Sequence, residues 1–147
     1  MIENQLRKFV SEEHIKNVYA GKWVEMFDDR GRKLSGIRGK VGVTALGIDG
    51  HEIGLDLMEL QPGTGFPLHS HAGDHILFVV SGEGIAMIGP EEHHLGMGDS
   101  IFVPAEQPHS FTALANITDP WIVVSVGHPH KHLSSVDRLR TLPSEGR

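Results

Sequence analysis

The chain of 147 residues contains no cysteine. This absence excludes disulfides, thiolate metal sites, iron–sulfur clusters and a cysteine nucleophile. Long apolar stretches are also missing, since the longest run, at residues 76–80, is far too short to cross a membrane. Residues 1–10 lack the apolar core of a signal peptide, so we expect a cytoplasmic protein without a membrane partner.

Positive charge is scarce as well. Lysine and arginine number 13 against 19 aspartates and glutamates, which gives a formal net charge of −6. Binding to phosphate backbones needs a basic face, so we do not expect nucleic acid as a partner. The hydrophobic fraction of 39% and the charged fraction of 22% are typical of one globular domain with its own core.

Glycine is abundant, with 18 residues, and after residue 40 short apolar runs alternate with turn residues. This pattern predicts an all-β fold, either a sandwich or a barrel of short strands. The expected strands are 41–48, 52–60, 75–80, 84–88, 92–95, 100–103, 109–115 and 121–126.

The two ends of the chain show helical spacing instead. Apolar residues recur at helical intervals between 2 and 20, and Ser11 is a possible start for a second short helix. Residues 23–27 predict a strand, 31–40 an extended arm or loop, and 134–142 a short C-terminal helix capped by Ser134. The expected organisation is an N-terminal helix and arm at 1–40, a β-barrel at 41–127 and a tail at 128–147.

The most informative residues are four of the 11 histidines, namely His69, His71, His75 and His109. Side chains at i and i+2 on a strand share a face, so His69, His71 and His75 have the same parity. His109 opens another apolar run, and two antiparallel strands of a barrel would bring the four imidazoles together. A divalent metal is the commonest reason for such a cluster. The alternative is surface histidines, or core histidines bonded to carbonyls.

The spacing of these residues resembles the two motifs of the cupin superfamily. The first motif places a glycine, a His-x-His pair, a glutamate and a second glycine in order, matched here by Gly63, His69, His71, His75 and Gly82. The second places a glycine, a proline and a histidine, matched by Gly98, Pro104 and His109. The resemblance covers about residues 41–127 and implies a small antiparallel jelly-roll barrel with a metal near one mouth.

Three positions depart from the motifs. His75 stands at the glutamate position, Glu106 replaces a glycine, and Ala113 stands where the second motif has an asparagine. With His75 as a ligand, the set resembles the four-histidine metal cupins. Four neutral ligands leave the full charge of a dication, which attracts an anion. Octahedral coordination would leave two positions open, and Fe, Mn, Ni, Zn, Co and Cu all remain candidates.

Strand parity also predicts the surroundings of the metal. Phe111 and Ala113 share the face of His109, and Leu77 and Val79 share that of His75, which makes an apolar pocket for a small organic molecule, or plain barrel core. Phe111 and Glu106 are the candidate catalytic residues. Glu106 would act as a base or orient a histidine, or is a solvated turn residue.

A second histidine string follows the last expected strand, at His128, His130 and His132. It contains a proline, so a flexible exit loop is the favoured interpretation, with metal binding as the alternative.

The first hypothesis for function is a metal-dependent oxidoreductase of the dioxygenase type that acts on a small organic substrate, with an anion favoured by the charge of the metal. The alternatives are a non-catalytic metal- or ligand-binding cupin that works through a partner protein, and a cupin isomerase or lyase. The resemblance also implies a homodimer.

Overall fold

The computed structural model describes residues 7–135 and 138–143. Its helical elements are α1 (Ser11–His14) and the 3-10 turn η1 (Val18–Ala20). Its strands are β1 (Val24–Phe27), β2 (Lys33–Leu46), β3 (Glu52–Leu60), β4 (Gly65–Ser70), β5 (Asp74–Ser81), β6 (Gly84–Ile88), β7 (Glu91–Leu95), β8 (Ser100–Val103), β9 (His109–Ala113), β10 (Trp121–His128) and β11 (Arg140–Thr141).

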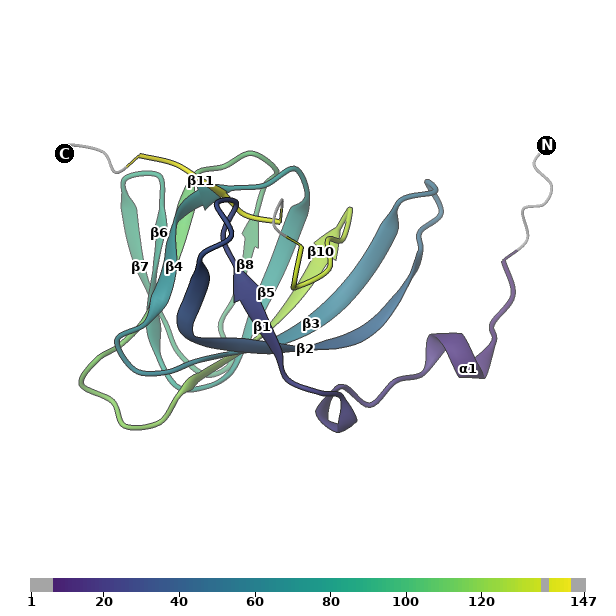
Figure 1. Ribbon diagram of the computed structural model, residues 1–147, viewed down its shortest axis with the longest axis horizontal. Helices are drawn as coiled ribbons and strands as arrows, with labels where there is room; N and C mark the ends of the chain where they lie inside the picture. The colour runs from purple at the N-terminus through teal and green to yellow at the C-terminus, as the bar shows by residue number, and fades with distance from the viewer. Residues whose placement is uncertain (1–6, 136–137, 144–147) are drawn as a thin grey trace.

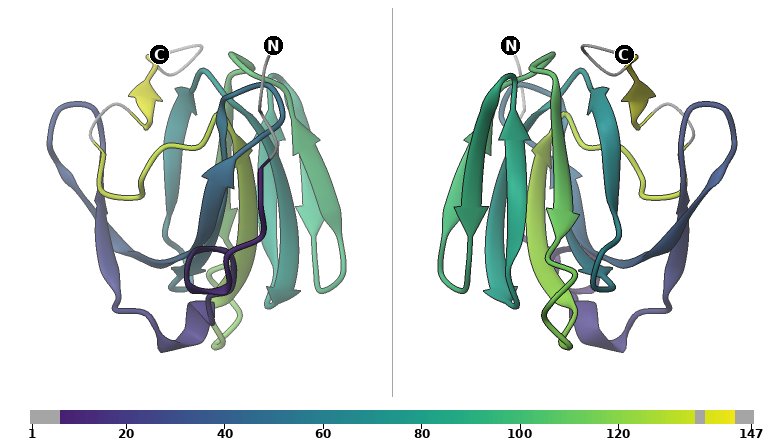
Figure 2. Two further views of the ribbon diagram at one scale, coloured as in Figure 1. Left: turned by 90° about the vertical axis from the view of Figure 1, so that its right-hand side faces the viewer. Right: turned by 90° about the vertical axis from the view of Figure 1, so that its left-hand side faces the viewer.

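These strands form two antiparallel sheets that close around one core (Figure 1), which confirms the predicted all-β jelly-roll fold. The six-stranded sheet has the order β1-β2-β3-β10-β5-β8, and the five-stranded sheet has the order β11-β4-β9-β6-β7. Figure 2 shows the barrel from two opposite sides.

Alternation along the strands fills the space between the sheets. In β5, Leu77 and Val79 point inward and are buried, whereas Ile76 and Phe78 lie on the outer face. In β10, Trp121 and Val123 alternate in the same way with half-buried neighbours. Residues i and i+2 therefore share the inner face, as the period of a strand requires.

The prediction of a helix over residues 2–20 is wrong for the part of this range that the structure describes. Within residues 7–20 there are only α1 and η1, and α1 begins at Ser11, the second expected start. Phe9, Ile15 and Tyr19 are exposed, so an amphipathic helix here would have no apolar surface to cover. None of the helices in the described part of the chain could span a membrane.

The expected C-terminal helix over 134–142 is also not found among its described residues, 134–135 and 138–142. The chain instead folds back across one end of the barrel, where Arg140 and Thr141 form β11 and pair with Ser70 and His69 of β4. Two further differences concern strands. β2 begins at Lys33 within the expected arm, and β4 was not expected as a strand.

Candidate metal centre

Three strands and one connection bring the predicted histidines to one end of the barrel. His69 lies near the end of β4 and faces His109, the first residue of β9, as its register partner in the five-stranded sheet. His75 comes from β5 in the opposite sheet, and His71 lies in the connection between β4 and β5. The cluster therefore bridges the two sheets.

The four imidazoles are buried, and each ring lies next to at least one other. The ring centroids of His69 and His109 are 4.2 Å apart, those of His71 and His109 4.7 Å, and those of His71 and His75 4.1 Å. One nitrogen each of His69, His71 and His109 lies within 4.8 Å of the others. Three buried histidines could thus share one ion, with His75 beside them.

Backbone carbonyls determine the tautomer of three of these rings. Nδ1 of His69 donates to the carbonyl of Pro67 at 2.6 Å, and Nδ1 of His109 donates to that of Gln107 at 2.6 Å. Nδ1 of His71 donates to the carbonyl of Gly73 at 3.1 Å. A carbonyl can only accept, so in the neutral rings the Nε2 atoms carry lone pairs, as metal-binding histidines require.

The inner nitrogens of the cluster lack suitable partners within the protein. Nε2 of His71 and Nε2 of His109 are 3.1 Å apart, although each is an acceptor in the neutral tautomer just described. Nδ1 of His75 is buried and has no hydrogen-bond partner among the described residues. A divalent cation would satisfy all of these lone pairs, so the residues fit a metal.

Gly127 on β10 makes room for His75, its register partner. A Cβ atom at position 127 would lie 2.9 Å from Nε2 of His75, closer than real Cβ contacts. The ring of His75 is therefore confined between Gly127 on one side and the ring of His71 on the other.

Burial keeps the histidines neutral. It lowers the pKa of His71 to about 4 and that of His75 to about 2, helped by repulsion from His109 and His71 respectively. Burial, with repulsion from His109, holds the pKa of His69 well below its ordinary value, and burial lowers the pKa of His109. Because only the neutral imidazole binds a metal, protons compete little for this site near neutral pH.

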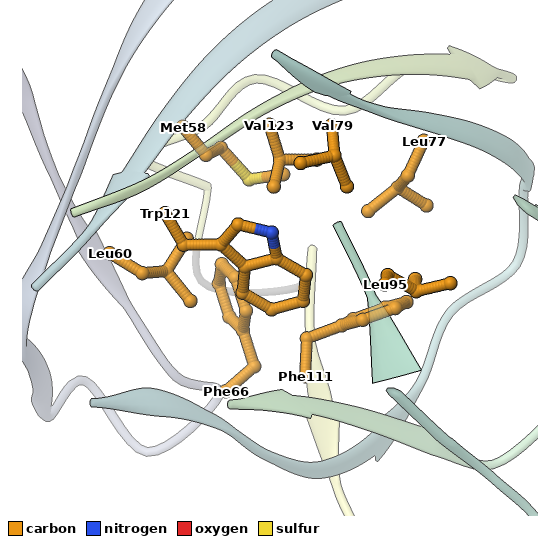
Figure 3. Close-up of a pocket in the computed structure, with 9 residues that line it drawn as sticks. All are labelled: Met58, Leu60, Phe66, Leu77, Val79, Leu95, Phe111, Trp121 and Val123. Atoms are coloured by element: carbon orange, nitrogen blue, oxygen red, sulfur yellow. The ribbon is translucent and has the colours of Figure 1, made fainter. Parts of the chain in front are cut away.

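The histidines surround a cavity of about 30 Å³, also lined by Met58, Phe66, Leu77, Phe111, Ser125, Arg138 and Leu139. A void of this size has room for about two water molecules. Next to it, apolar side chains in the barrel interior leave a void of about 10 Å³. The indole of Trp121 is one of the groups that line this void (Figure 3). Leu77 and Phe111 line both spaces, whereas Val79 lines only the apolar one.

The two candidate catalytic residues lie in different places. Phe111 lines the cavity, and its ring meets that of His109 edge-on at 5.5 Å. Glu106 lies outside the cavity in a turn with φ of 68°, and its exposed carboxylate pairs with Arg140. Its backbone amide donates to the carbonyl of His71 at 2.8 Å, so Glu106 touches the cluster only through the main chain.

The second histidine string does not form a cluster. His130 is buried and bonds to Asp56 at 2.9 Å, His128 pairs with Asp49, and His132 bonds to Ser134. The prediction of a flexible exit loop is therefore wrong at His130. This side chain binds the segment after β10 to Asp56 of β3.

Arg138 was missed by the sequence analysis. It is buried, and it reaches the histidine cavity because the C-terminal segment returns over the barrel end. No local sequence pattern identifies Arg138 as a site residue, because its position depends on how the C-terminal segment folds back over the barrel end.

The fold and site define a small jelly-roll barrel with a histidine cluster at one end. A family model for the cupin domain matches residues 56–127, which contain all four histidines. The chain belongs to the cupin superfamily. The comparison with curated proteins gave no significant match.

Solved structures agree on the fold. A cupin-2 domain from Rhodospirillum rubrum has a TM-score of 0.67 at 18% identity, with 95% of this chain and 84% of that chain covered. KdgF from a Halomonas species has a TM-score of 0.65 at 19% identity, over 80% of this chain and 94% of that one. The polyketide cyclase RemF from Streptomyces resistomycificus has a TM-score of 0.63 at 17% identity, over 95% and 89%.

Proposed function

We propose that this cupin is a metal-dependent enzyme that acts on a small organic molecule, with His69, His71, His75 and His109 as the metal ligands. The observation that carries this proposal is that one nitrogen each of three buried histidines lies within 4.8 Å of the others. The Nδ1 atom of each of these rings donates to a carbonyl, and the unpartnered Nδ1 of His75 lies beside them.

The residues around the cluster are more suitable for a catalytic metal site than for a structural one. No carboxylate lines the cavity within the described residues, so the ligand set is neutral and the positive charge of a bound dication stays available to an anionic ligand. Phe66, Phe111 and Leu77 limit water to the small space beside the histidines. A redox-active divalent metal in this site would supply Lewis acidity and electron transfer to dioxygen.

The reaction we favour is a dioxygenation. Both atoms of dioxygen would end in the product and the organic substrate would supply the electrons, so no further reductant is needed. A non-redox reaction on the same centre, such as isomerisation, elimination or cyclisation, is the second candidate, because the fold of RemF, a polyketide cyclase, aligns with 95% of this chain.

Metal content decides whether the centre exists. Untagged protein is expected to hold one equivalent of metal by mass spectrometry, and His69→Ala and His109→Ala are expected to lose it. His94→Ala is the matched control, because His94 is an exposed histidine that pairs with Glu83 on the barrel surface. Retention of metal by both site variants would refute the proposal.

Oxygen consumption separates the two reactions. Metal-replete protein is screened with enolisable small acids and ketones in an oxygen electrode, with product followed by mass spectrometry. Uptake that yields a product heavier by two oxygen atoms supports the dioxygenase, whereas turnover under nitrogen supports the non-redox alternative.

A further inference from the structure

A buried guanidinium forms part of the wall of the histidine cavity. Arg138 is only 8% exposed, and among the described residues that line the cavity it is the one with a permanent charge. An arginine stays protonated in proteins, so this wall is cationic whether or not a metal is bound.

The guanidinium is incompletely used by the protein. Its Nη1 donates to the carbonyl of Lys131 at 2.9 Å and reaches Oδ2 of Asp56 only at 3.4 Å, which is longer than a tight charge-assisted bond. Its Nη2 has the sulfur of Met58 at 4.0 Å, a weak acceptor, as its partner among the described residues.

The carboxylate of Asp56 is shared between two donors. Its Oδ2 also accepts from Nε2 of His130 at 2.9 Å, the shorter of the two contacts, and its Oδ1 is buried with no hydrogen-bond partner among the described residues. Arg138 lines the cavity, and these contacts leave N–H groups of its guanidinium from which a second carboxylate could accept hydrogen bonds. A planar guanidinium matches a carboxylate in two parallel bonds.

The space beside Arg138 has the right size for such a group. The cavity of about 30 Å³ holds about two water molecules, and the two oxygens of a carboxylate would replace them. Phe66, Phe111 and Leu139 would then contact the carbon atoms next to the carboxylate.

We infer that Arg138 binds the carboxylate of the substrate beside the histidine centre, so that the substrate class is a small carboxylic acid. This inference rests on the proposed function of the same site. The competing interpretation is that Arg138 only fastens the C-terminal segment to Asp56.

The test uses acetate and its neutral isostere acetamide as probes. Their dissociation constants are measured by ligand-detected NMR on Zn²⁺-loaded protein, with metal content determined on every sample, and repeated on metal-free protein. The proteins are wild type, Arg138→Met, Asp56→Asn and the matched control Arg140→Met, which removes an exposed guanidinium from the same segment.

Wild type and the control are expected to prefer acetate, and Arg138→Met is expected to lower this preference about 10-fold or more, as for the loss of a charge-assisted bond. Asp56→Asn removes the competing carboxylate and is expected to leave acetate binding equal or tighter. If Arg138 only fastens the segment, both variants weaken acetate binding in parallel, and that result overturns the inference.

Other outcomes are also decisive. If Arg138→Met does not fold, Asp56→Asn carries the test, since equal or tighter acetate binding supports the inference and weaker binding contradicts it. Wild-type protein that holds zinc but does not prefer acetate overturns the role of Arg138 and leaves the metal centre standing. Wild-type protein without zinc overturns the proposed function, and the metal-free titration then still decides the role of Arg138.

Discussion

Replacing Gly127 by alanine tests whether His75 is a metal ligand without substituting any histidine. The added Cβ would lie 2.9 Å from Nε2 and 3.2 Å from Cδ2 of His75. An ordinary contact begins at 3.4 Å, so the ring must move by about 0.5 Å. The φ of Gly127 is not positive, so alanine adds no backbone strain.

The expected effect falls on metal binding more than on folding. Displacement of a ligand ring by a fraction of an ångström resembles the loss of a group that orients a ligand, which weakens metal affinity by about 10- to 100-fold. The free energy of unfolding of the metal-free protein should change by only about 1 kcal/mol, since alanine also restricts the unfolded chain. Competition with a chromophoric chelator measures the affinity, and urea unfolding measures the stability.

Gly96→Ala is the matched control. A Cβ at Gly96 would meet nothing closer than Cγ of Glu83 at 3.8 Å, and its backbone also has no positive φ. Wild-type zinc affinity in Gly127→Ala, together with a measurable change in its stability, would refute the role of His75. The centre would then consist of His69, His71 and His109 alone.

Three further predictions concern stability. In metal-free protein the unfolding free energy should fall by about 3 kcal/mol or more from pH 7 to pH 4, because the unfolded chain protonates His71 and His75 near pH 6.5 while burial lowers their folded pKa to about 4 and about 2; a flat profile in urea titrations would contradict this. Gly84→Ala should cost about 1–3 kcal/mol by thermal or urea unfolding, because its Cβ would lie 2.3 Å from the ring of Trp121, and unchanged stability would disprove that contact. Arg38→Met should cost less than about 1 kcal/mol yet shift the fluorescence of Trp23, on whose ring the exposed guanidinium lies at 3.8 Å, whereas an unchanged spectrum would argue against this stacking.

The sequence predicted the barrel because its signals are local. Strand alternation and turn residues mark most strands within a few residues of their ends, and parity correctly placed Leu77, Val79 and Phe111 on the inner face. β4 was missed because Pro67 interrupts it, and the structure accommodates the proline at a register shift between Phe66 and His69.

The N-terminal helix failed for a different reason. Helical spacing of apolar residues predicts a helix only if another surface covers the apolar face, and a short isolated helix is marginal in water. Phe9, Ile15 and Tyr19 are 70%, 66% and 64% exposed, so that covering surface does not exist within the described chain.

The residues of the candidate site also differ in whether a local sequence pattern identifies them. The histidine spacing is a local pattern, and it led to four rings that the structure brings into contact. Arg138 and Leu139 carry no such pattern, because their contacts arise when the chain crosses the barrel end and Leu142 donates its amide to the carbonyl of Leu68. No property of residues 128–143 alone shows what that segment will cover.

The position of the cavity follows from how the barrel is filled. Trp121 and the apolar side chains around it leave a space smaller than one water molecule, so no substrate can enter the middle of the barrel (Figure 3). Among the described residues, the end with the histidines combines free space, the unpartnered Nδ1 of His75 and the buried guanidinium of Arg138. The barrel supplies the histidines, and the C-terminal segment supplies Arg138 and Leu139. If Arg138 binds the substrate as inferred, changes in that segment are expected to alter the preferred ligand without altering the histidine cluster.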